Sequence, residues 1–176
     1  MKSSTSHKIK KRENPKDIFV TPRELAKSHI DMIETTEEVW LDPCRFNESG
    51  SYYSQFHNNK DWCEIKENKD FLCYDHEIDV ICGNPPYSML DKWFKKSIEL
   101  NPRVISYLIG INNLTTRRME WFQDAGYGLS QMKMLKVWSW FGMSVICVWE
   151  KHGEQVMQYD RTVWRNENDK QKVKLN

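Results

Sequence analysis

Short apolar runs alternate along this chain with segments of helical periodicity, and this alternation limits the possible folds more than any other feature. Six runs have the length and composition of strands: 39–41, 62–65, 80–82, 104–109, 129–135 and 144–149. Three segments space their apolar residues as helices do: 22–33, 88–100 and 116–125. Strands that alternate with helices form parallel sheets, and two consecutive strands form an antiparallel hairpin. The sequence therefore predicts an α/β fold with a doubly wound, mostly parallel sheet and an antiparallel C-terminal hairpin.

Two hydroxyl side chains stand where helices are expected to begin. Thr21 precedes Pro22, which favours Thr21 as the N-cap and Pro22 as the first residue of the 22–33 helix. Ser88 is predicted to cap the 88–100 helix, whose large apolar residues repeat on one face.

The chain of 176 residues is long enough for one domain with a single core. We predict that 17–160 form this domain, between a flexible basic arm at 1–16 and a flexible polar tail at 161–176. No apolar run approaches the roughly 20 residues of a membrane span, and the N-terminus carries no apolar block typical of a signal peptide. These features predict a cytoplasmic protein without a membrane partner.

Charge and cysteine content exclude several classes of function. A net charge of +1 is small for a protein that holds a long duplex alone, so the chain must concentrate basic residues locally, bind weakly or use a partner. The five cysteines form no CxxC pair, so neither a disulfide framework nor a metal site is predicted.

Polar residues follow three of the predicted strands. Asp42, Glu64 and Asn84 each stand at the end of an apolar run. In open α/β sheets ligands bind outside the carboxyl ends of the strands. The sequence therefore predicts that these three side chains contribute to one ligand site.

The segment 79–87 (DVICGNPPY) carries the most specific chemistry in the chain. Its apolar strand leads into Asn84, Pro85, Pro86 and Tyr87, and the two prolines make a stiff turn without amide donors. The side-chain oxygen of Asn84 and the carbonyl of Pro85 form a pair of acceptors, which suits a planar NH2 group that donates twice. Tyr87 adds a flat face on which an aromatic base can stack. We predict Asn84, Pro85, Pro86 and Tyr87 as the catalytic residues.

This segment resembles motif IV of the class I S-adenosylmethionine-dependent amino-methyltransferases, in the NPPY form of the N6-adenine DNA methyltransferases. Further segments between about Ile18 and Trp149 resemble the same family in its order. The resemblance implies a Rossmann-like methyltransferase fold and S-adenosyl-L-methionine as the cofactor. It also implies direct methyl transfer to an adenine in DNA that is unpaired or flipped out of the duplex.

The resemblance further implies which residues contact the cofactor. They are Asn84 of the NPPY turn; Phe19, Thr21 and Pro22 at the methionine end; Asp42, Pro43 and Gly50 in the loop after the first strand; Glu64 and Ile65 at the ribose; and Asp70 and Phe71 at the adenine. The family's loop after the first strand usually carries two closely spaced glycines, whereas the segment 45–50 (RFNESG) has Gly50 alone.

No separate target-recognition domain is visible, so loops at the carboxyl edge of the sheet are expected to contact the substrate. The candidate substrate-binding residues are Tyr87, Arg117, Arg118, Trp138 and Trp140. The two tryptophans are equally expected to pack on the core, and the two arginines to form a solvated helix face. A protein partner or a second copy of the chain is a further candidate source of target recognition. A compact enzyme of this kind would suit a viral or phage genome.

Three alternative functions remain open from the sequence. The same site suits N6-adenine methylation of RNA, although relatives with tyrosine after the two prolines commonly act on DNA. An NPPY turn also orients the side-chain amide of glutamine in protein methyltransferases. The third alternative is a catalytically inactive, methyltransferase-like partner, which the altered glycine loop keeps open.

Overall fold

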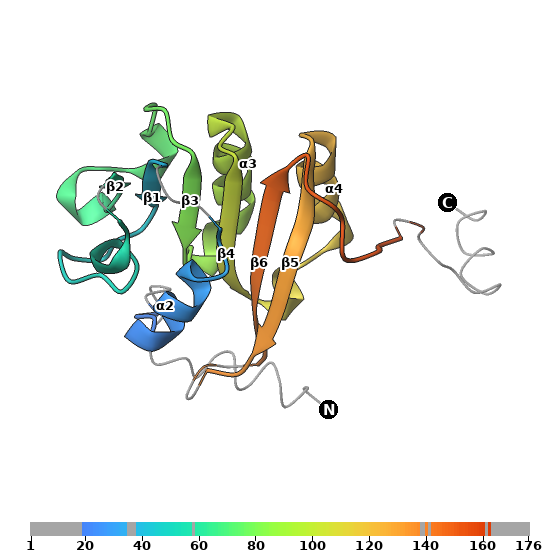
Figure 1. Ribbon diagram of the computed structural model, residues 1–176, viewed down its shortest axis with the longest axis horizontal. Coiled ribbons are helices and arrows are strands. Elements are labelled where there is room, and N and C mark those ends of the chain that lie inside the picture. The colour runs from blue at the N-terminus through green and yellow to red at the C-terminus, as the bar shows by residue number, and fades with distance from the viewer. Residues whose placement is uncertain are drawn as a thin grey trace, which may run out of the picture.

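A single mixed sheet forms the centre of the computed structural model, which describes residues 19–34, 38–57, 59–137, 140, 142–160 and 162. The sheet has six strands in the order β2-β1-β3-β4-β6-β5 (Figure 1). The strands are β1 (Trp40–Asp42), β2 (Lys60–Trp62), β3 (Val80–Gly83), β4 (Val104–Gly110), β5 (Tyr127–Leu135) and β6 (Ser144–Lys151). The predicted arm at 1–16, Trp138 and all of the predicted tail except Thr162 lie outside the described residues.

The pairing of the strands confirms the predicted fold class. β2, β1, β3 and β4 run parallel to one another, whereas β6 pairs antiparallel with both β4 and β5. The C-terminal hairpin of β5 and β6 therefore completes the sheet with its second strand inserted beside β4, as the order of strands shows.

Helices cover both faces of this sheet. The helix α2 (Arg23–Ile30) lies in front of the sheet in Figure 1, and α3 (Leu90–Leu100) and α4 (Thr116–Asp124) lie behind it. The alternation of side chains along β4 explains the two layers. Ile105 and Tyr107 belong to the core cluster beneath α3 and α4, and Val104 and Leu108 to the cluster beneath α2.

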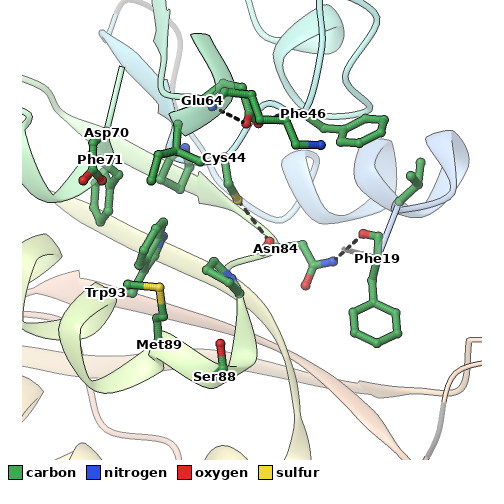
Figure 2. Close-up of a pocket in the computed structure, with 15 residues that line it drawn as sticks. Phe19, Cys44, Phe46, Glu64, Asp70, Phe71, Asn84, Ser88, Met89 and Trp93 are labelled. Atoms are coloured by element: carbon green, nitrogen blue, oxygen red, sulfur yellow. Dashed lines mark hydrogen bonds between the residues drawn. The ribbon is translucent and has the colours of Figure 1, made fainter. Parts of the chain in front are cut away.

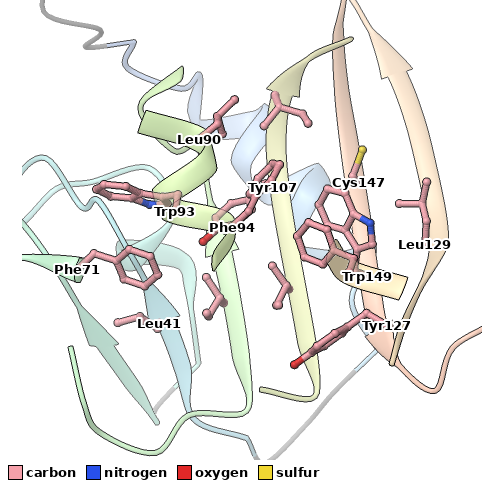
Figure 3. Close-up of a cluster of buried hydrophobic side chains, with 14 of the residues drawn as sticks. Leu41, Phe71, Leu90, Trp93, Phe94, Tyr107, Tyr127, Leu129, Cys147 and Trp149 are labelled. Atoms are coloured by element: carbon pink, nitrogen blue, oxygen red, sulfur yellow. The ribbon is translucent and has the colours of Figure 1, made fainter. Parts of the chain in front are cut away.

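Aromatic rings fill the core on the α3 and α4 side of the sheet (Figure 3). The ring of Phe122 stacks on that of Trp149 with 4.2 Å between their centroids. Phe94 contacts both of these residues as well as Tyr107. Each such side chain buries a large apolar area, so this cluster stabilises the packing of α3 and α4 on the sheet.

No helix within the described ranges has the length and apolarity that a membrane span requires. The longest of them, α3, has 11 residues.

Both predicted helix caps were wrong, because tertiary contacts and the proline turn take precedence over local capping. Pro22, not Thr21, is the N-cap of α2, and the hydroxyl of Thr21 instead accepts a hydrogen bond from the side chain of Asn84. The helix α3 begins at Leu90 rather than at Ser88. The amide of Met89 donates to the carbonyl of Pro86, which holds the residues before α3 in a tight 3-10 turn.

The second strand also ends earlier than predicted, at Trp62. Glu64 and Lys69 exchange two backbone hydrogen bonds, from the amide of each to the carbonyl of the other, and thereby form a small antiparallel bridge. Glu64 therefore pairs with a residue further along the chain, and it follows the strand by two residues instead of lying within it.

Candidate active site

A cavity of about 360 Å³ opens at the carboxyl ends of β1 and β3 (Figure 2). A smaller cavity of about 150 Å³ adjoins it, and the two share five lining residues: Phe19, Val20, Cys44, Phe46 and Asn84. The larger volume falls in the range of roughly 300–1,000 Å³ that is typical of small-molecule sites. The position matches the expectation for an open α/β sheet, where ligands bind beyond the strand ends.

Asn84 lies between the two cavities, directly after β3. Its Nδ2 donates to the carbonyl of Phe19 at 3.1 Å and to Oγ1 of Thr21 at 3.3 Å. Because a carbonyl oxygen can only accept, the nitrogen of the amide must face Phe19 and the oxygen must face away. Among the described residues Oδ1 has no hydrogen-bond partner, although the atom is buried.

This orphaned acceptor, Oδ1 of Asn84, has an energetic cost that calls for an explanation. A buried carbonyl oxygen without a donor loses the free energy of its hydrogen bonds to water, which amounts to about 1–3 kcal/mol. Native structures leave few such atoms unsatisfied, and those few often lie at functional sites. The segment around Phe19 and Thr21 thus holds Asn84 in the one amide orientation that can receive a donor group.

The remainder of the proline turn lies beside Asn84. Pro85 is buried, and Pro86 lines the larger cavity. The ring of Tyr87 stacks on that of Phe19, with 6.1 Å between centroids and 26° between planes. Trp140 meets the same Phe19 ring edge-on at 5.7 Å and also packs against the core beneath α2. Two of the predicted substrate-binding residues therefore gather around one phenylalanine.

Glu64 forms a fixed carboxylate on the wall of the larger cavity. It is 9% exposed, and its two oxygens accept hydrogen bonds from the amides of Phe46 at 2.9 Å and Lys66 at 3.1 Å. A carboxylate has about four acceptor positions, so two remain for a ligand. The neighbouring Ile65 is 70% exposed and lines the same cavity.

Asp70 and Phe71 line the same cavity. Oδ1 of Asp70 accepts from the amide of Leu72 at 3.0 Å, which fixes the carboxylate at the start of a short 3-10 helix. Phe71 is buried and packs against Trp93 with 5.0 Å between ring centroids. The indole N–H of Trp93 is buried and has no acceptor within the described residues. The wall therefore combines fixed acceptors with apolar rings and an unpaired donor.

Asp42 lies in the smaller cavity at the end of β1. Its oxygens accept from the amides of Cys44 and Tyr53, each at 3.1 Å. The side chain is 2% exposed, and this burial raises the pKa of Asp42 from 3.8 to about 7, because a charge without water around it is unfavourable.

The loop after β1 has one glycine, and the structure explains its position. A Cβ on Gly50 would lie 2.3 Å from the carbonyl oxygen of Arg45, so no larger residue fits without movement. The side chain of Arg45 connects the loop to two residues further along the chain. Its guanidinium lies 3.5 Å from the ring centroid of Trp62 and pairs with Glu67 at 2.7 Å. This loop therefore keeps its shape through side-chain contacts.

Five of the predicted binding residues in the described part of the chain line neither cavity: Pro22, Tyr87, Arg117, Arg118 and Trp140. Pro22 begins α2, and its carbonyl accepts from the amide of Ala26. Arg118 connects α4 to α3, since it donates to Asp91 at 2.8 Å and to the carbonyl of Asn113 at 2.8 Å. Arg117 is exposed, with its guanidinium 5.0 Å from the ring centroid of Trp121.

The other predicted cofactor residues all line a cavity. The larger cavity is lined by Phe19, Pro43, Glu64, Ile65, Asp70, Phe71 and Asn84. Thr21, Asp42 and Gly50 line the smaller one. Sequence reasoning missed Phe46, Met89 and Trp93 as lining residues. Helical spacing was a usable signal for Trp93, since it puts this residue on the face of α3 that carries Leu90, but such a face is equally typical of core packing. Met89 ends the 3-10 turn before α3, so helical spacing gives no signal for it.

Solved structures match this fold, whereas no protein-family model and no curated protein sequence matches the chain. A Pyrococcus horikoshii protein provisionally described as an RNA methyltransferase is 13% identical, with a TM-score of 0.56 over 86% of this chain and 99% of that one. TrmN from Thermus thermophilus is 16% identical, with a TM-score of 0.53 over 76% of this chain and 50% of that one. A chain of the E. cuniculi Mtq2–Trm112 complex, responsible for methylation of the termination factor eRF1, is 14% identical, with a TM-score of 0.53 over 77% of this chain and 98% of that one.

These similarities define the class of fold. The described sheet and helices form the Rossmann-like fold of methyltransferases, as the resemblance implied.

Proposed function

We propose that this chain is an S-adenosylmethionine-dependent methyltransferase that methylates the exocyclic amine of adenine in a nucleic acid, with DNA as the first candidate. The observation that carries this proposal is the buried Oδ1 of Asn84, which is held in place and lacks a donor within the described part of the chain. The segment 17–160 contains every described helix and strand, and we take it as the catalytic domain.

The residues around the two cavities fit the cofactor. Glu64 and Asp70 offer carboxylate oxygens to hydroxyl and amine donors, and Ile65 and Phe71 offer apolar surface to a flat ring. The buried indole N–H of Trp93 lacks an acceptor among the described residues, and a bound heterocycle would supply one. Thr21, Asp42 and Gly50 in the smaller cavity would hold the methionine end. When bound, the cofactor supplies a methyl group on a sulfonium, which is already an activated electrophile.

The proline turn would prepare the amine for this transfer. The lone pair of the adenine amine is delocalised into its ring, so the amine is a poor nucleophile. Oδ1 of Asn84 and the carbonyl of Pro85 would accept its two hydrogens, draw the nitrogen toward a tetrahedral shape and restore the lone pair. No general base is needed before the transfer, because the proton of the product leaves to water.

The ring of Tyr87 would stack on the target base, a contact worth about 1–3 kcal/mol. A base within a duplex cannot reach this turn, so the target must be unpaired or flipped out. Trp140 lies next to the Phe19 ring that contacts Tyr87, which favours it as a second aromatic surface for nucleic acid.

RNA remains the second substrate to test, because the Pyrococcus horikoshii neighbour is provisionally described as an RNA methyltransferase. A glutamine side chain is the third, since the Mtq2–Trm112 complex is described as methylating a protein. The first measurement is calorimetry with S-adenosylhomocysteine, in which absence of binding would identify a non-catalytic relative. The second is transfer of labelled methyl groups to DNA, RNA and a glutamine-containing peptide, with the product nucleoside identified by mass spectrometry. N6-methyladenine in DNA is the expected product.

A matched pair of variants connects the product to the site. Asn84→Ala removes the orphaned acceptor, whereas Asn112→Ala changes an exposed asparagine of the 3-10 turn Ile111–Asn113. Loss of transfer in the first variant alone supports the proposal. Equal activity of both variants contradicts it.

A further inference from the structure

Phe46 adopts a backbone conformation that a bulky side chain rarely occupies. Its φ angle is +70°, in the left-handed region that glycine enters without strain. It lies in the loop after β1, where the family that this chain resembles usually has closely spaced glycines. Strained residues of this kind persist where the surrounding structure imposes them, and they gather at functional sites.

The backbone of Phe46 has a function that any residue, glycine included, could perform. Its amide donates to Oε2 of Glu64 at 2.9 Å and thereby helps to fix that carboxylate. The strain therefore needs an explanation that involves the ring.

Core packing does not supply this explanation, because Phe46 is 40% exposed. Figure 2 shows Phe46 among the residues that line the larger cavity. The residue also lines the smaller cavity, so it lies where the two meet. Nζ of Lys66 lies 5.4 Å from the ring centroid, which shows that the ring already offers a face to a cation.

The chemistry of the proposed ligand changes at this junction. In the proposed function the adenosine occupies the cavity of Glu64 and Asp70, and the methionine end occupies that of Thr21 and Asp42. The sulfonium joins these two parts of the cofactor. Its positive charge would thus lie among the residues that both cavities share, and Phe46 is one of them.

We propose that Phe46 is a specificity-determining residue whose ring favours the cationic cofactor over its neutral, demethylated product. This inference rests on the proposed function. Loss of the methyl group turns the sulfonium into an uncharged thioether, which an aromatic face attracts less. The ring would thereby hold the cofactor before transfer and weaken the binding of the product after it.

The test compares dissociation constants of S-adenosylmethionine, S-adenosylhomocysteine and sinefungin by calorimetry on the full chain. Sinefungin carries a protonated amine in place of the sulfonium, so it separates charge from the methyl group. Phe46→Leu keeps an apolar side chain but removes the aromatic face. We expect its preference for the two cationic ligands over S-adenosylhomocysteine to fall by about 3- to 30-fold.

Two further variants keep the outcome independent of folding. Phe46→Gly suits the left-handed backbone and keeps the amide donor to Glu64, so it should fold at least as stably as the parent and show the same loss of preference. Ile65→Ala removes another exposed apolar side chain, one that lines the larger cavity but not the smaller. This variant should weaken the binding of all three ligands equally.

The results distinguish the inference from the function on which it rests. Equal weakening of all three ligands in Phe46→Leu and Phe46→Gly overturns the role of the ring but leaves the proposed function intact. Failure of the parent chain to bind any of the three ligands overturns the proposed function itself.

Discussion

The buried carboxyl of Asp42 makes stability depend on pH in a direction opposite to that of most aspartates. Its pKa is about 7 in the folded chain, against 3.8 for an ordinary aspartate. Between these values the folded chain holds a proton that the unfolded chain has released. The stabilisation from this proton is complete below pH 3.8 and is lost as the pH rises to about 7. At about 1.4 kcal/mol per pH unit, the whole loss is about 4 kcal/mol.

Asp42→Asn removes this titration. The amide oxygen can accept from only one of the amides of Cys44 and Tyr53, so the variant loses about 1–3 kcal/mol at every pH. The variant has no carboxylate, however, so it does not bury the charge that Asp42 carries in the parent above pH 7. Between pH 5 and 8 the unfolding free energy of the variant, relative to the parent, is expected to rise by about 3 kcal/mol, since the parent loses the stabilisation from its bound proton over the two units from 5 to about 7.

Urea-induced unfolding, followed by tryptophan fluorescence at pH 5 and pH 8, measures this difference. Asp31→Asn is the matched control, because the side chain of Asp31 is 57% exposed. This variant should show the same pH dependence of stability as the parent. If the stabilities of Asp42→Asn and the parent run parallel across this range, the carboxyl does not carry its proton at neutral pH, and the reasoning fails.

Four further predictions concern the cavity and its substrate. Glu64→Ala should weaken the binding of S-adenosylhomocysteine at least tenfold in calorimetry, because charged hydrogen bonds carry about 1.5–3 kcal/mol each. Unchanged affinity would show that the carboxylate does not contact the cofactor. Asn84→Ala should abolish methyl transfer with a much smaller change in cofactor affinity, and turnover within a few-fold of the parent would refute its role. Gly50→Ala should lower the unfolding free energy in urea by about 1–3 kcal/mol, because its Cβ meets the carbonyl of Arg45, and an equally stable variant would mean that the loop shifts freely. Initial rates on one oligonucleotide should be higher when it is single-stranded and should fall gently with salt, whereas a steep salt slope with a duplex preference would point to an unrecognised basic surface.

The sequence alone was sufficient to predict the architecture. The apolar runs at 80–82 and 104–109 are buried strands, and the pair at 129–135 and 144–149 forms the expected antiparallel hairpin. Such runs can be interpreted locally because the periodicity of apolar residues reflects the geometry of one strand or helix. The NPPY turn was found for the same reason, since prolines restrict the backbone wherever they occur.

Helix starts and residue roles depended on distant partners. Thr21 has the sequence of an N-cap, yet its hydroxyl accepts from Asn84, which is 63 residues away. The orientation of the Asn84 amide depends in turn on the carbonyl of Phe19. No local pattern contains these pairings, because they arise only when the sheet brings separate segments together.

The sequence by itself determined the layers of this protein, the order of its elements and the position of the proline turn at 84–87, because hydrophobic period and proline geometry act over a few residues. The tertiary structure alone decided that one acceptor of that turn is buried without a donor in the described chain, that Asp42 is shielded enough to hold a proton near pH 7, and that Phe46 lies where two cavities meet. Burial, desolvation and cavity shape are properties of the whole packed chain, so they emerge only when the elements assemble.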